Sequence, residues 1–469
     1  MAAQTWDRRP PATRRRDQGR LLATWLDTEV RPFSPFWSER LGGVTVDSLQ
    51  DLADLPVTEE RELAAAGGPG NSGLLLLPSE DAFKRHGSRN ELLAAARELR
   101  RGGPDARRAA LFRRYKPVHV HEAGVAVVLA VAYTRRDLDR LHLAGARLAE
   151  VLGLGADDAL VNAVPAGPTL RFWTLYHAAL AARITALHPC GAGQAPLAPV
   201  ARALAMLPAT VLAVPVGQAL GLLEGLAERG TALPGLRTLL TVGPPPPPAT
   251  RAALAEAVAG LGARQPRVQA AWAPECARAL WAECRPPGAD PVEATYGLHT
   301  YPDLDLVEVR DLTAGRAAAP GQPGELVYTS LGWRGTALVR AATGSWTGGL
   351  VGDVPCPACG RTVPRLAPAA ADAAWQPRVR ADDGRVVYVD LRRAPAVLTP
   401  GALAGVGARD WSLRAVDGRL VLALDLVDDV TGAAADLARA VGRAVGVVPD
   451  VVVGPRAASA RPQLGAAGA

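Results

Sequence analysis

The sequence predicts an α/β fold: a large N-terminal domain of mixed sheets and helices, followed by a small C-terminal α+β domain. Apolar, β-branched runs at 124–134 and 210–217 alternate with helical patterns at 135–154 and 249–261. This alternation is typical of strands joined by helices. A strand-rich stretch then leads into a final unit of roughly 75 residues, which is long enough to fold separately.

The chain before this alternation is predicted to be helical. Residues 20–66 have the pattern of helices broken by turns, and Thr58 is predicted to cap one of them, with Glu59 in its first turn. An Arg-rich amphipathic stretch over 90–115 predicts a further helix, which the Gly-Gly-Pro at 102–104 interrupts.

Composition divides the chain into four segments. Arginines cluster near the start, where a solvated arm is expected, and the last residues are low in complexity, where a frayed tail is expected. The predicted segments are an Arg-rich flexible arm at 1–25, the large domain at 26–379, the small domain at 380–455 and a flexible tail at 456–469.

Charge and hydropathy argue against two classes of partner. The 469 residues carry a formal net charge of +6, but basic residues are scattered among acids and form no stripe of the kind that binds nucleic acid. The longest uncharged stretch, 203–223, is interrupted by Pro208 and Pro215 and predicts a strand with turns, not a membrane helix. The first twenty residues lack the apolar region of a signal peptide, so a cytoplasmic protein is expected. The oligomeric state is not indicated.

Five cysteines in so long a chain argue against a disulfide framework and favour metal binding or catalysis wherever they cluster. Cys356 and Cys359 form a C-x-x-C pair followed by Gly360, a turn in which two thiolates point at one ion. A structural zinc needs two more ligands, and spacing alone leaves open whether they exist or whether this is a surface pair. Cys190 and Cys276 are predicted to be small buried residues.

A zinc hydrolase is not favoured, because the H-E-x-x-H and G-x-S-x-G motifs are absent. His119 and His121 alternate onto one face of a predicted strand. A loop or core role is favoured over a metal site, because two histidines without further ligands bind a metal weakly.

Three segments resemble phenylacetate–CoA ligases, a family of the adenylate-forming superfamily of AMP-dependent synthetases and ligases. They read AECR and GLHTYPD around Cys284 and His299, GELVYTSLGWRGTALVRAATGSW at 324–346, and CPACGRTVPRL at 356–366. The resemblance extends over most of the chain from about residue 30 and is most specific in the cysteine-containing segments.

The resemblance implies a fold, a reaction and cofactors. The large domain would be of the adenylate-forming type, and the small domain would move between two half-reactions. Such ligases activate an aryl or acyl carboxylate with ATP and Mg²⁺ as an acyl-adenylate, and then transfer the acyl group to CoA. The resemblance also implies a structural Zn²⁺ held by Cys284, His299, Cys356 and Cys359.

The positions that would contact the nucleotide depart from the family's pattern. At the phosphate loop the chain reads HEAGVAVV. Only Gly124 there suits a loop that wraps around phosphate, and the carboxylate of Glu122 would repel the phosphate. On the adenine side, Gly243 is followed by five prolines, each of which lacks a backbone donor. Glu275 remains where the family holds Mg²⁺ and is the candidate catalytic residue.

Two further departures concern the ribose and the transition state. After Thr343 and Gly344, Ser345 stands where the family has an aspartate that binds both ribose hydroxyls, and a serine cannot accept two hydrogen bonds from a diol as a carboxylate does. Ala460 stands where the family has a lysine, a loss worth about a hundredfold or more in rate. Two nearby arginines are imperfect replacements, because Arg and Lys are not interchangeable at a positioned site.

The sequence thus predicts a phenylacetate–CoA ligase-like pseudoenzyme, whose ATP-dependent carboxylate activation is impaired or lost. The alternative is an active, divergent carboxylate–CoA ligase that uses Glu275 and forms an acyl-adenylate; ATP, Mg²⁺ and CoA are expected cofactors only in that case. The expected ligand is a small aryl or acyl carboxylate, in an apolar pocket between 162–177 and 271–281. Trp272 and the other aromatic residues there fit the core as well as a pocket lining.

Overall fold

The structure is a computed structural model in which the chain forms two compact units. The first comprises Met1–Thr343 and Thr347–Ala370, and the second comprises Gly344–Trp346 and Ala371–Ala469. The described residues are 6–66, 72–86, 89–123, 129–167, 169–191, 196–246, 248–284, 296–311, 316–352, 354–367, 371–372, 378–380, 386–388, 394, 397–398, 400–416, 418–426, 431–445, 447–453 and 464–465.

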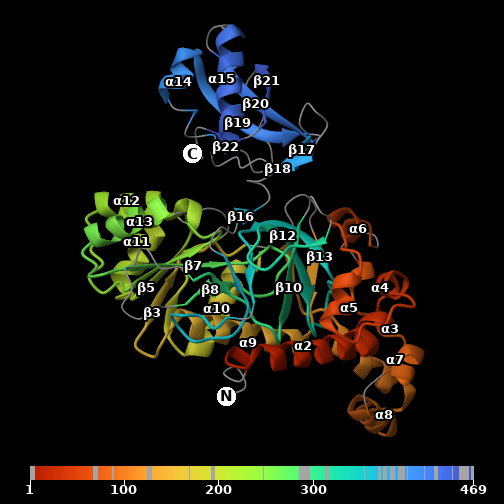
Figure 1. Ribbon diagram of the computed structural model, residues 1–469. Helices are drawn as coiled ribbons and strands as arrows, with labels where there is room; N and C mark the ends of the chain where they lie inside the picture. The colour runs from red at the N-terminus through yellow and green to blue at the C-terminus, as the bar shows by residue number, and fades with distance from the viewer. Residues whose placement is uncertain are drawn as a thin grey trace. The chain divides into compact units, whose positions relative to one another are not determined.

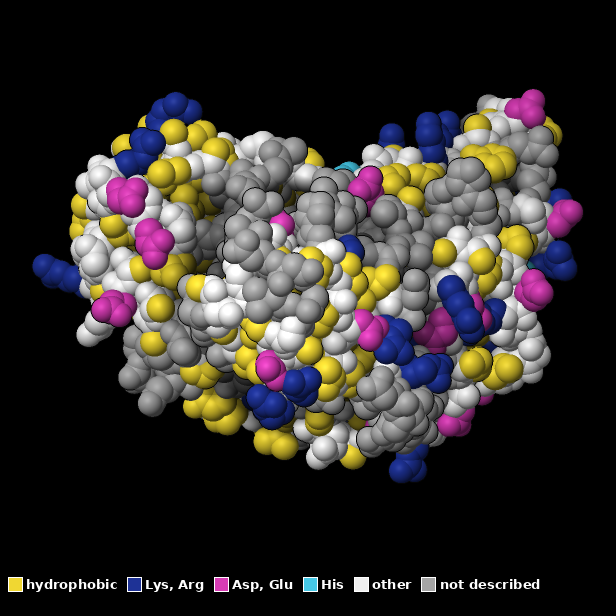
Figure 2. All heavy atoms as spheres, turned by 90° about the horizontal axis from the view of Figure 1, so that it is seen from above, with side chains coloured by type: hydrophobic (Ala, Val, Ile, Leu, Met, Phe, Trp, Pro, Cys, Tyr) yellow, Lys and Arg dark blue, Asp and Glu magenta, His cyan; other side chains and the backbone are white. Residues whose placement is uncertain are grey.

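The predicted α/β class is confirmed, with large sheets and helices in the first unit and a smaller α+β second unit (Figure 1). The predicted start of the small domain at residue 380 lies inside the second unit. No helix in the described part of the chain has the length and apolar character needed to cross a membrane. On the face drawn in Figure 2, the described Lys and Arg side chains are interspersed with Asp and Glu.

The first unit begins with helices, including part of the predicted flexible arm. Helix α2 (Pro11–Trp25) buries Leu22 and Trp25, and Arg14 is only 2% exposed. Nη2 of Arg14 donates to the carbonyl oxygen of Gly352 at 2.7 Å, so this part of the arm is packed against the first unit. The helices that follow are η1 (Leu26–Val30), α3 (Arg31–Phe33), α4 (Pro35–Arg40), α5 (Leu49–Asp54), α6 (Glu60–Ala65), η2 (Ser72–Leu74), α7 (Glu80–His86) and α8 (Arg89–Tyr115).

Two predictions about these helices have different outcomes. The cap predicted at Thr58 is wrong: α6 is capped by Glu59, and the hydroxyl of Thr58 instead donates to the carbonyl oxygen of Val339 at 3.0 Å. The predicted interruption of the later helix is confirmed, because Gly103 of α8 has φ 75°, which helical residues do not adopt.

A β-hairpin leads into two packed helices. Strands β1 (His119–Ala123) and β2 (Leu129–Tyr133) pair antiparallel, and α9 (Arg135–Leu152) follows with Thr134 as its N-cap. Helix α10 (Leu170–Ala182) packs against α9 at Gly145. An added Cβ at Gly145 would lie 2.6 Å from the backbone nitrogen of Ala178, so only glycine permits this close approach.

The largest sheet of the described residues has nine strands in the order β14-β15-β9-β8-β7-β6-β5-β3-β4. Its β7-to-β4 part is parallel, whereas β8 and the strands beyond it are antiparallel to their neighbours. The strands are β3 (Ala159–Asn162), β4 (Thr185–Leu187), β5 (Val211–Pro215), β6 (Thr238–Val242), β7 (Arg267–Trp272), β8 (Trp281–Glu283), β9 (Leu298–His299), β14 (Leu350–Val351) and β15 (Arg365–Leu366).

Besides α10, which joins β3 to β4, the helices between the parallel strands are α11 (Leu197–Met206), the 3-10 helix η3 (Val216–Gln218), α12 (Ala219–Glu228) and α13 (Pro248–Gly260). The second sheet has the order β11-β10-β12-β13-β16, and β12 is buried along its whole length. Its strands are β10 (Asp305–Asp311), β11 (Arg316–Ala317), β12 (Gly324–Ser330), β13 (Ala341–Thr347) and β16 (Ala371–Asp372).

The second unit has its own core, formed by residues such as Trp411, Leu422 and Val441. Its four-stranded sheet has the order β21-β20-β19-β22, and a separate hairpin pairs β17 with β18. The elements are β17 (Arg378–Arg380), β18 (Val386–Tyr388), α14 (Pro400–Gly405), β19 (Ala408–Val416), β20 (Arg419–Leu426), α15 (Thr431–Val445), β21 (Asp450–Val453) and β22 (Leu464–Gly465).

A buried carboxyl group lies at the start of β10. Asp305 is 1% exposed, and its carboxyl oxygens accept hydrogen bonds from Oη of Tyr328 at 2.6 Å and from Nε1 of Trp281 at 3.2 Å. Burial raises the pKa of Asp305 to about 6, although both hydrogen bonds oppose this shift. The folded protein therefore retains this proton at a pH where the unfolded chain has lost it.

We expect this proton to make the protein less stable as the pH rises. Between the unfolded pKa near 3.8 and the folded pKa near 6, the folded state binds more protons, so the free energy of unfolding falls by about 3 kcal/mol through this group. Asp305→Asn removes that contribution. Urea unfolding from pH 4 to 6 should show a smaller decline for the variant, and equal slopes would contradict the prediction.

Candidate metal centre and ligand site

Four predicted metal ligands meet in the first unit, although they come from separate segments. Cys284 follows β8, His299 ends β9, and Cys356 and Cys359 lie on a turn after β14. Their donor atoms all lie within 4.8 Å of one another. The Sγ atoms of Cys284 and Cys356 are 3.7 Å apart, and Sγ of Cys359 is 3.3 Å from Nε2 of His299.

Strand pairing brings Cys284 and His299 together. His299 lies opposite Ala282 of β8 on one side and Arg365 of β15 on the other. Gly297, just before β9, has φ +90°, and an added Cβ would lie 2.2 Å from the carbonyl oxygen of Leu366. Glycine at this position therefore allows β9 to approach β15 and places the histidine at the cluster.

The turn that carries Cys356 and Cys359 is closed by its own backbone. The N–H of Gly360 donates to the carbonyl oxygen of Cys356 at 2.8 Å, and the N–H of Cys356 donates to that of Arg361 at 2.8 Å. Gly360 has φ 68°, in the left-handed region that favours glycine. The turn inferred from the C-x-x-C-G pattern is thus the turn observed.

The four residues fit a tetrahedral zinc ion. With Zn–S bonds of about 2.3 Å, the sulfur–sulfur edge of a tetrahedron is about 3.8 Å, close to the 3.7 Å between Cys284 and Cys356. Nδ1 of His299 lies 3.3 Å from the carbonyl oxygen of Ala282. A proton on Nδ1 is therefore directed at that carbonyl, and Nε2 is left to bind the metal.

Charge around Cys359 favours the thiolate form that a metal requires. A hydrogen bond from Cys284 lowers the pKa of the Cys359 thiol. Nη2 of Arg8 donates to the carbonyl oxygen of Cys359 at 3.2 Å, and Nε of Arg361 donates to Oδ2 of Asp7 at 2.9 Å. Against the effect of burial, hydrogen bonds to Cys359 and Asp7 raise the pKa of Arg361.

The candidate catalytic residue, Glu275, lies just after β7 and forms an ion pair with Arg171 in the first turn of α10. The Arg171 side chain is 31% exposed and that of Glu275 is 17% exposed. Beside the pair is a cavity of about 10 Å³. Its lining residues are Leu170, Arg171, Thr174, Ala273, Pro274, Glu275, Ala277, Ala279 and Leu280. The cavity lies between the two segments of the predicted pocket, but it has room for only about one water molecule.

Gly243, predicted to contact the nucleotide, lies at the same edge of the largest sheet as Glu275. The two residues follow the neighbouring parallel strands β6 and β7, and the N–H of Gly243 donates to the carbonyl oxygen of Ala271 at 3.0 Å. Gly243 has φ 138°, and an added Cβ would lie 2.6 Å from Cγ1 of Val216. Packing alone is therefore enough to require glycine here.

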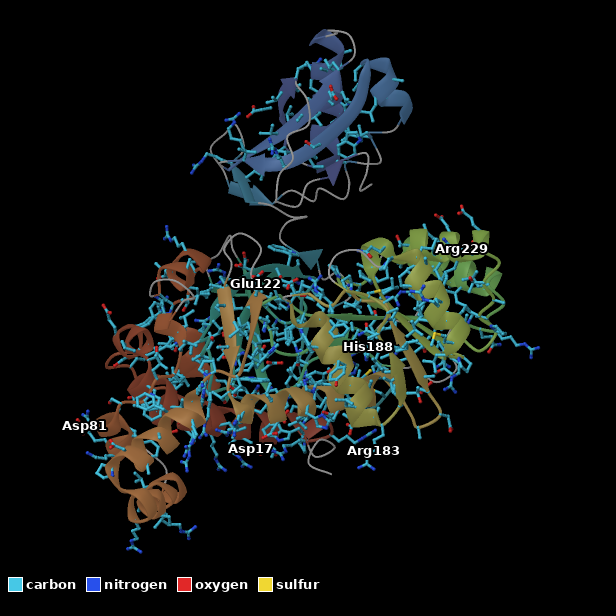
Figure 3. All side chains as sticks on the ribbon, turned by 180° about the vertical axis from the view of Figure 1, so that it is seen from behind. Asp17, Asp81, Glu122, Arg183, His188 and Arg229 are labelled. Carbon is cyan, nitrogen blue, oxygen red and sulfur yellow. The ribbon has the colours of Figure 1, made fainter. Side chains whose placement is uncertain are left out.

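The other predicted nucleotide contacts lie elsewhere or are not described. Thr343, Gly344 and Ser345 lie on β13 of the second sheet, where the hydroxyl of Thr343 donates to the carbonyl oxygen of Leu326 at 2.8 Å. Gly124 and Ala460 lie outside the described residues. Glu122, just before the first of these undescribed segments, is exposed on β1 (Figure 3).

Comparison with known proteins gives matches at the level of structure. No family model matches the chain, and no curated protein matches its sequence. An open conformation of 2-hydroxyisobutyryl-CoA ligase in complex with 2-HIB-AMP and CoA is similar, with a TM-score of 0.63, 20% identity, and coverage of 97% of this chain and 91% of that chain. The postadenylation state of that ligase in complex with R3-HIB-AMP has a TM-score of 0.65, 20% identity, and coverage of 98% and 90%. The chain has the adenylate-forming ligase fold.

Within this ligase fold, the structure adds a residue that the sequence pattern did not indicate. Arg171 is one of many arginines in the chain, so its pairing with Glu275, 104 residues away, has no local signature. The aromatic residues of the predicted pocket divide between core and periphery. Trp272 and Trp281 are fully buried, whereas Trp173 and Tyr176 are half-buried on α10.

Proposed function

We propose that this chain is a phenylacetate–CoA ligase-like protein in which ATP-dependent carboxylate activation is impaired or lost, while a small aryl or acyl carboxylate remains its ligand. The observation that supports this most strongly is the ion pair between Arg171 and Glu275. In this pair the guanidinium of Arg171, which is always charged, contacts the carboxylate that the sequence resemblance assigns to Mg²⁺.

The ion pair works against a metal at this position. Mg²⁺ binds through one or two carboxylates together with water and phosphate oxygens, and these ligands must surround it in near-octahedral geometry. The guanidinium of Arg171 already neutralises the carboxylate of Glu275 and occupies one of its oxygens. Separating the pair would leave an arginine only 31% exposed without its counterion.

Two neighbouring features support the same proposal. The residues after Gly243 are prolines, which supply no backbone N–H for an adenine or a phosphate. Gly243 itself has its N–H engaged with Ala271. At the proposed ribose position, Ser345 offers one hydroxyl where a carboxylate would accept two hydrogen bonds.

The proposal includes a structural zinc ion held by Cys284, His299, Cys356 and Cys359. The four protein ligands complete a tetrahedral shell, which is the arrangement of zinc sites that stabilise a fold. The ion would cross-link β8, β9 and the turn after β14. The protein's own contribution is to orient His299 through Ala282 and to place positive charge near the thiolates.

An ATP–pyrophosphate exchange assay tests the loss of activation. With phenylacetate, benzoate or 2-hydroxyisobutyrate and millimolar MgATP, we expect no exchange above the no-enzyme background, and MgATP alone should give no shift in Tm. Arg171→Gln should remain inactive, because the other nucleotide contacts are still missing.

Exchange at rates of ordinary ligases would overturn this proposal and favour the active, divergent ligase. In that case Arg171 would act on the phosphates, and Arg171→Gln should lower the exchange rate about a hundredfold or more. Arg136→Gln is the matched control, because Arg136 is a 46% exposed arginine on a neighbouring helix, away from the cavity residues.

A further inference from the structure

A buried arginine follows Glu275 by three residues, between Ala277 and Ala279 of the cavity lining. Arg278 is 0% exposed, and its guanidinium lies over the rings of Tyr133 at 5.2 Å and Trp333 at 5.0 Å. Its Nη2 donates to the carbonyl oxygen of Thr336. No Asp or Glu among the described residues forms an ion pair with it, and its Nε and Nη1 have no hydrogen-bond partner.

Other polar groups near Arg278 also lack partners. Tyr133 is fully buried and its Oη makes no hydrogen bond. His121 is 2% exposed, and its ring lies 5.2 Å from the ring of Tyr133 at an angle of 34°. Neither of its nitrogens has a partner with good hydrogen-bond geometry, although the backbone of Glu275 is near enough to oppose the lowering of its pKa. Nε1 of Trp272, at the end of β7, also has no hydrogen-bond partner. Buried polar groups are normally paired, so this concentration of unused donors marks a place for an acceptor.

We propose that Arg278, Tyr133 and His121 form a buried anion site that binds the carboxylate of a small monocarboxylic acid. This inference deepens the proposed function and rests on it, because it names the groups that hold the carboxylate. The guanidinium supplies the countercharge, and its two free N–H groups with Oη of Tyr133 supply the hydrogen bonds.

The charge of the site selects a monoanion. Arg278 brings one positive charge, and the neighbouring histidine does not add a second, because burial lowers the pKa of His121 to about 3. One buried positive charge is balanced by one negative charge, and a dianion such as phosphate would leave an excess charge without solvent. A planar carboxylate also matches the fork of the guanidinium.

The route to this site passes the ion pair. Ala277 and Ala279, which flank Arg278 in the chain, line the cavity beside Arg171 and Glu275. At about 10 Å³ the cavity does not hold an aryl acid, so the partly exposed side chains of the pair must move aside when one enters. Arg278 itself does not line the cavity, so the proposed site opens to the guanidinium only when the pair and the chain at 277–279 give way.

Binding of phenylacetate and acetate to the full chain tests the site. Calorimetry measures it without ATP at an alkaline pH, where inorganic phosphate is the dianion used for comparison. We expect both carboxylates to bind and phosphate not to bind. Tyr133→Phe removes only a hydroxyl and should weaken phenylacetate binding about fivefold to tenfold. Arg278→Met should abolish binding, while Tm without ligand stays the same or rises, because an unpaired buried charge is removed.

Arg140→Met is the control, because Arg140 also lies over Trp333, at 5.1 Å, but donates to the carbonyl oxygens of Asp303 and Leu331. It should lose stability and keep its affinity for phenylacetate. The anion site is overturned if no carboxylate binds, or if binding is unchanged in both Arg278→Met and Tyr133→Phe. Exchange activity reports separately on the proposed function: exchange together with Arg278-dependent binding retains the anion site and rejects the loss of activation.

Discussion

Replacing Cys356 and Cys359 together with serine is expected to remove about one zinc ion per chain and to destabilise the first unit by several kcal/mol. The four ligands join segments that are far apart in the chain, so the metal contributes directly to the folded state. Serine hydroxyls do not form the thiolates that zinc requires. Tm should fall by about 5 °C or more, as measured by calorimetry beside metal analysis.

Cys190→Ser provides the matched control, because Cys190 is also buried, at 5% exposure, but lies outside the cluster. It should keep its zinc and lose only about 1 kcal/mol, the usual cost of a new buried hydroxyl. A double variant that loses its zinc but keeps the wild-type melting curve would refute the structural role. A wild-type protein purified without metal, and unchanged in Tm when zinc is added, would refute the metal site itself.

Arg147→Met is expected to have the second large effect, about 3–5 kcal/mol of lost stability. Arg147 is fully buried on α9 and donates to Oδ1 of Asp7 at 2.6 Å and to Oδ2 of Asp303 at 2.8 Å. Without it, both carboxylates lose a buried counterion. Burial already raises the pKa of Asp303, so the uncompensated charge there is costly. The midpoint of urea unfolding, followed by tryptophan fluorescence, measures the loss.

A second substitution separates charge from packing. Adding Asp303→Asn to Arg147→Met should recover part of the lost stability, because it removes the carboxylate that has lost its ion pair, whereas Asp7 keeps its pair with Arg361. Arg136→Met on the same helix breaks only a partly exposed pair with Glu29 and should cost about 1 kcal/mol or less. A wild-type unfolding midpoint for Arg147→Met would contradict the prediction.

Local chemistry in the sequence was enough to predict much of the fold. The helix after Thr134 begins where the pattern changes, because Asp137 accepts from both the N–H and the hydroxyl of that residue and closes the cap. The turn at Cys356 and Cys359 likewise depends on neighbouring residues. The order of the nine strands in the largest sheet depends on pairings distant in sequence, and no local pattern specifies it.

The candidate site was likewise predictable only in part. The four residues of the Cys-His cluster could be brought together by resemblance, because cysteine and histidine are rare in this chain and their metal chemistry is narrow. Arg171 and Arg278 could not, because arginine is common in this chain and what distinguishes these two is their surroundings. In the Arg-rich start of the chain, charge next to charge predicts exposure, which holds for Arg15, Arg16 and Arg20 but not for Arg14, whose partners lie far away in the sequence.

That N-terminal helix has a consequence for the order of folding during synthesis. Arg14 hydrogen-bonds a residue 348 positions later, so at about 5–20 residues per second α2 lacks this partner for about 17–70 s. Trp25, on the apolar face of the helix, likewise lacks its partner, because its Nε1 donates to the carbonyl oxygen of Trp333, 308 positions later. Arg15, Arg16 and Arg20 are exposed and keep the nascent helix soluble, whereas Arg14 becomes a buried hydrogen-bond donor only after the distant segment has emerged.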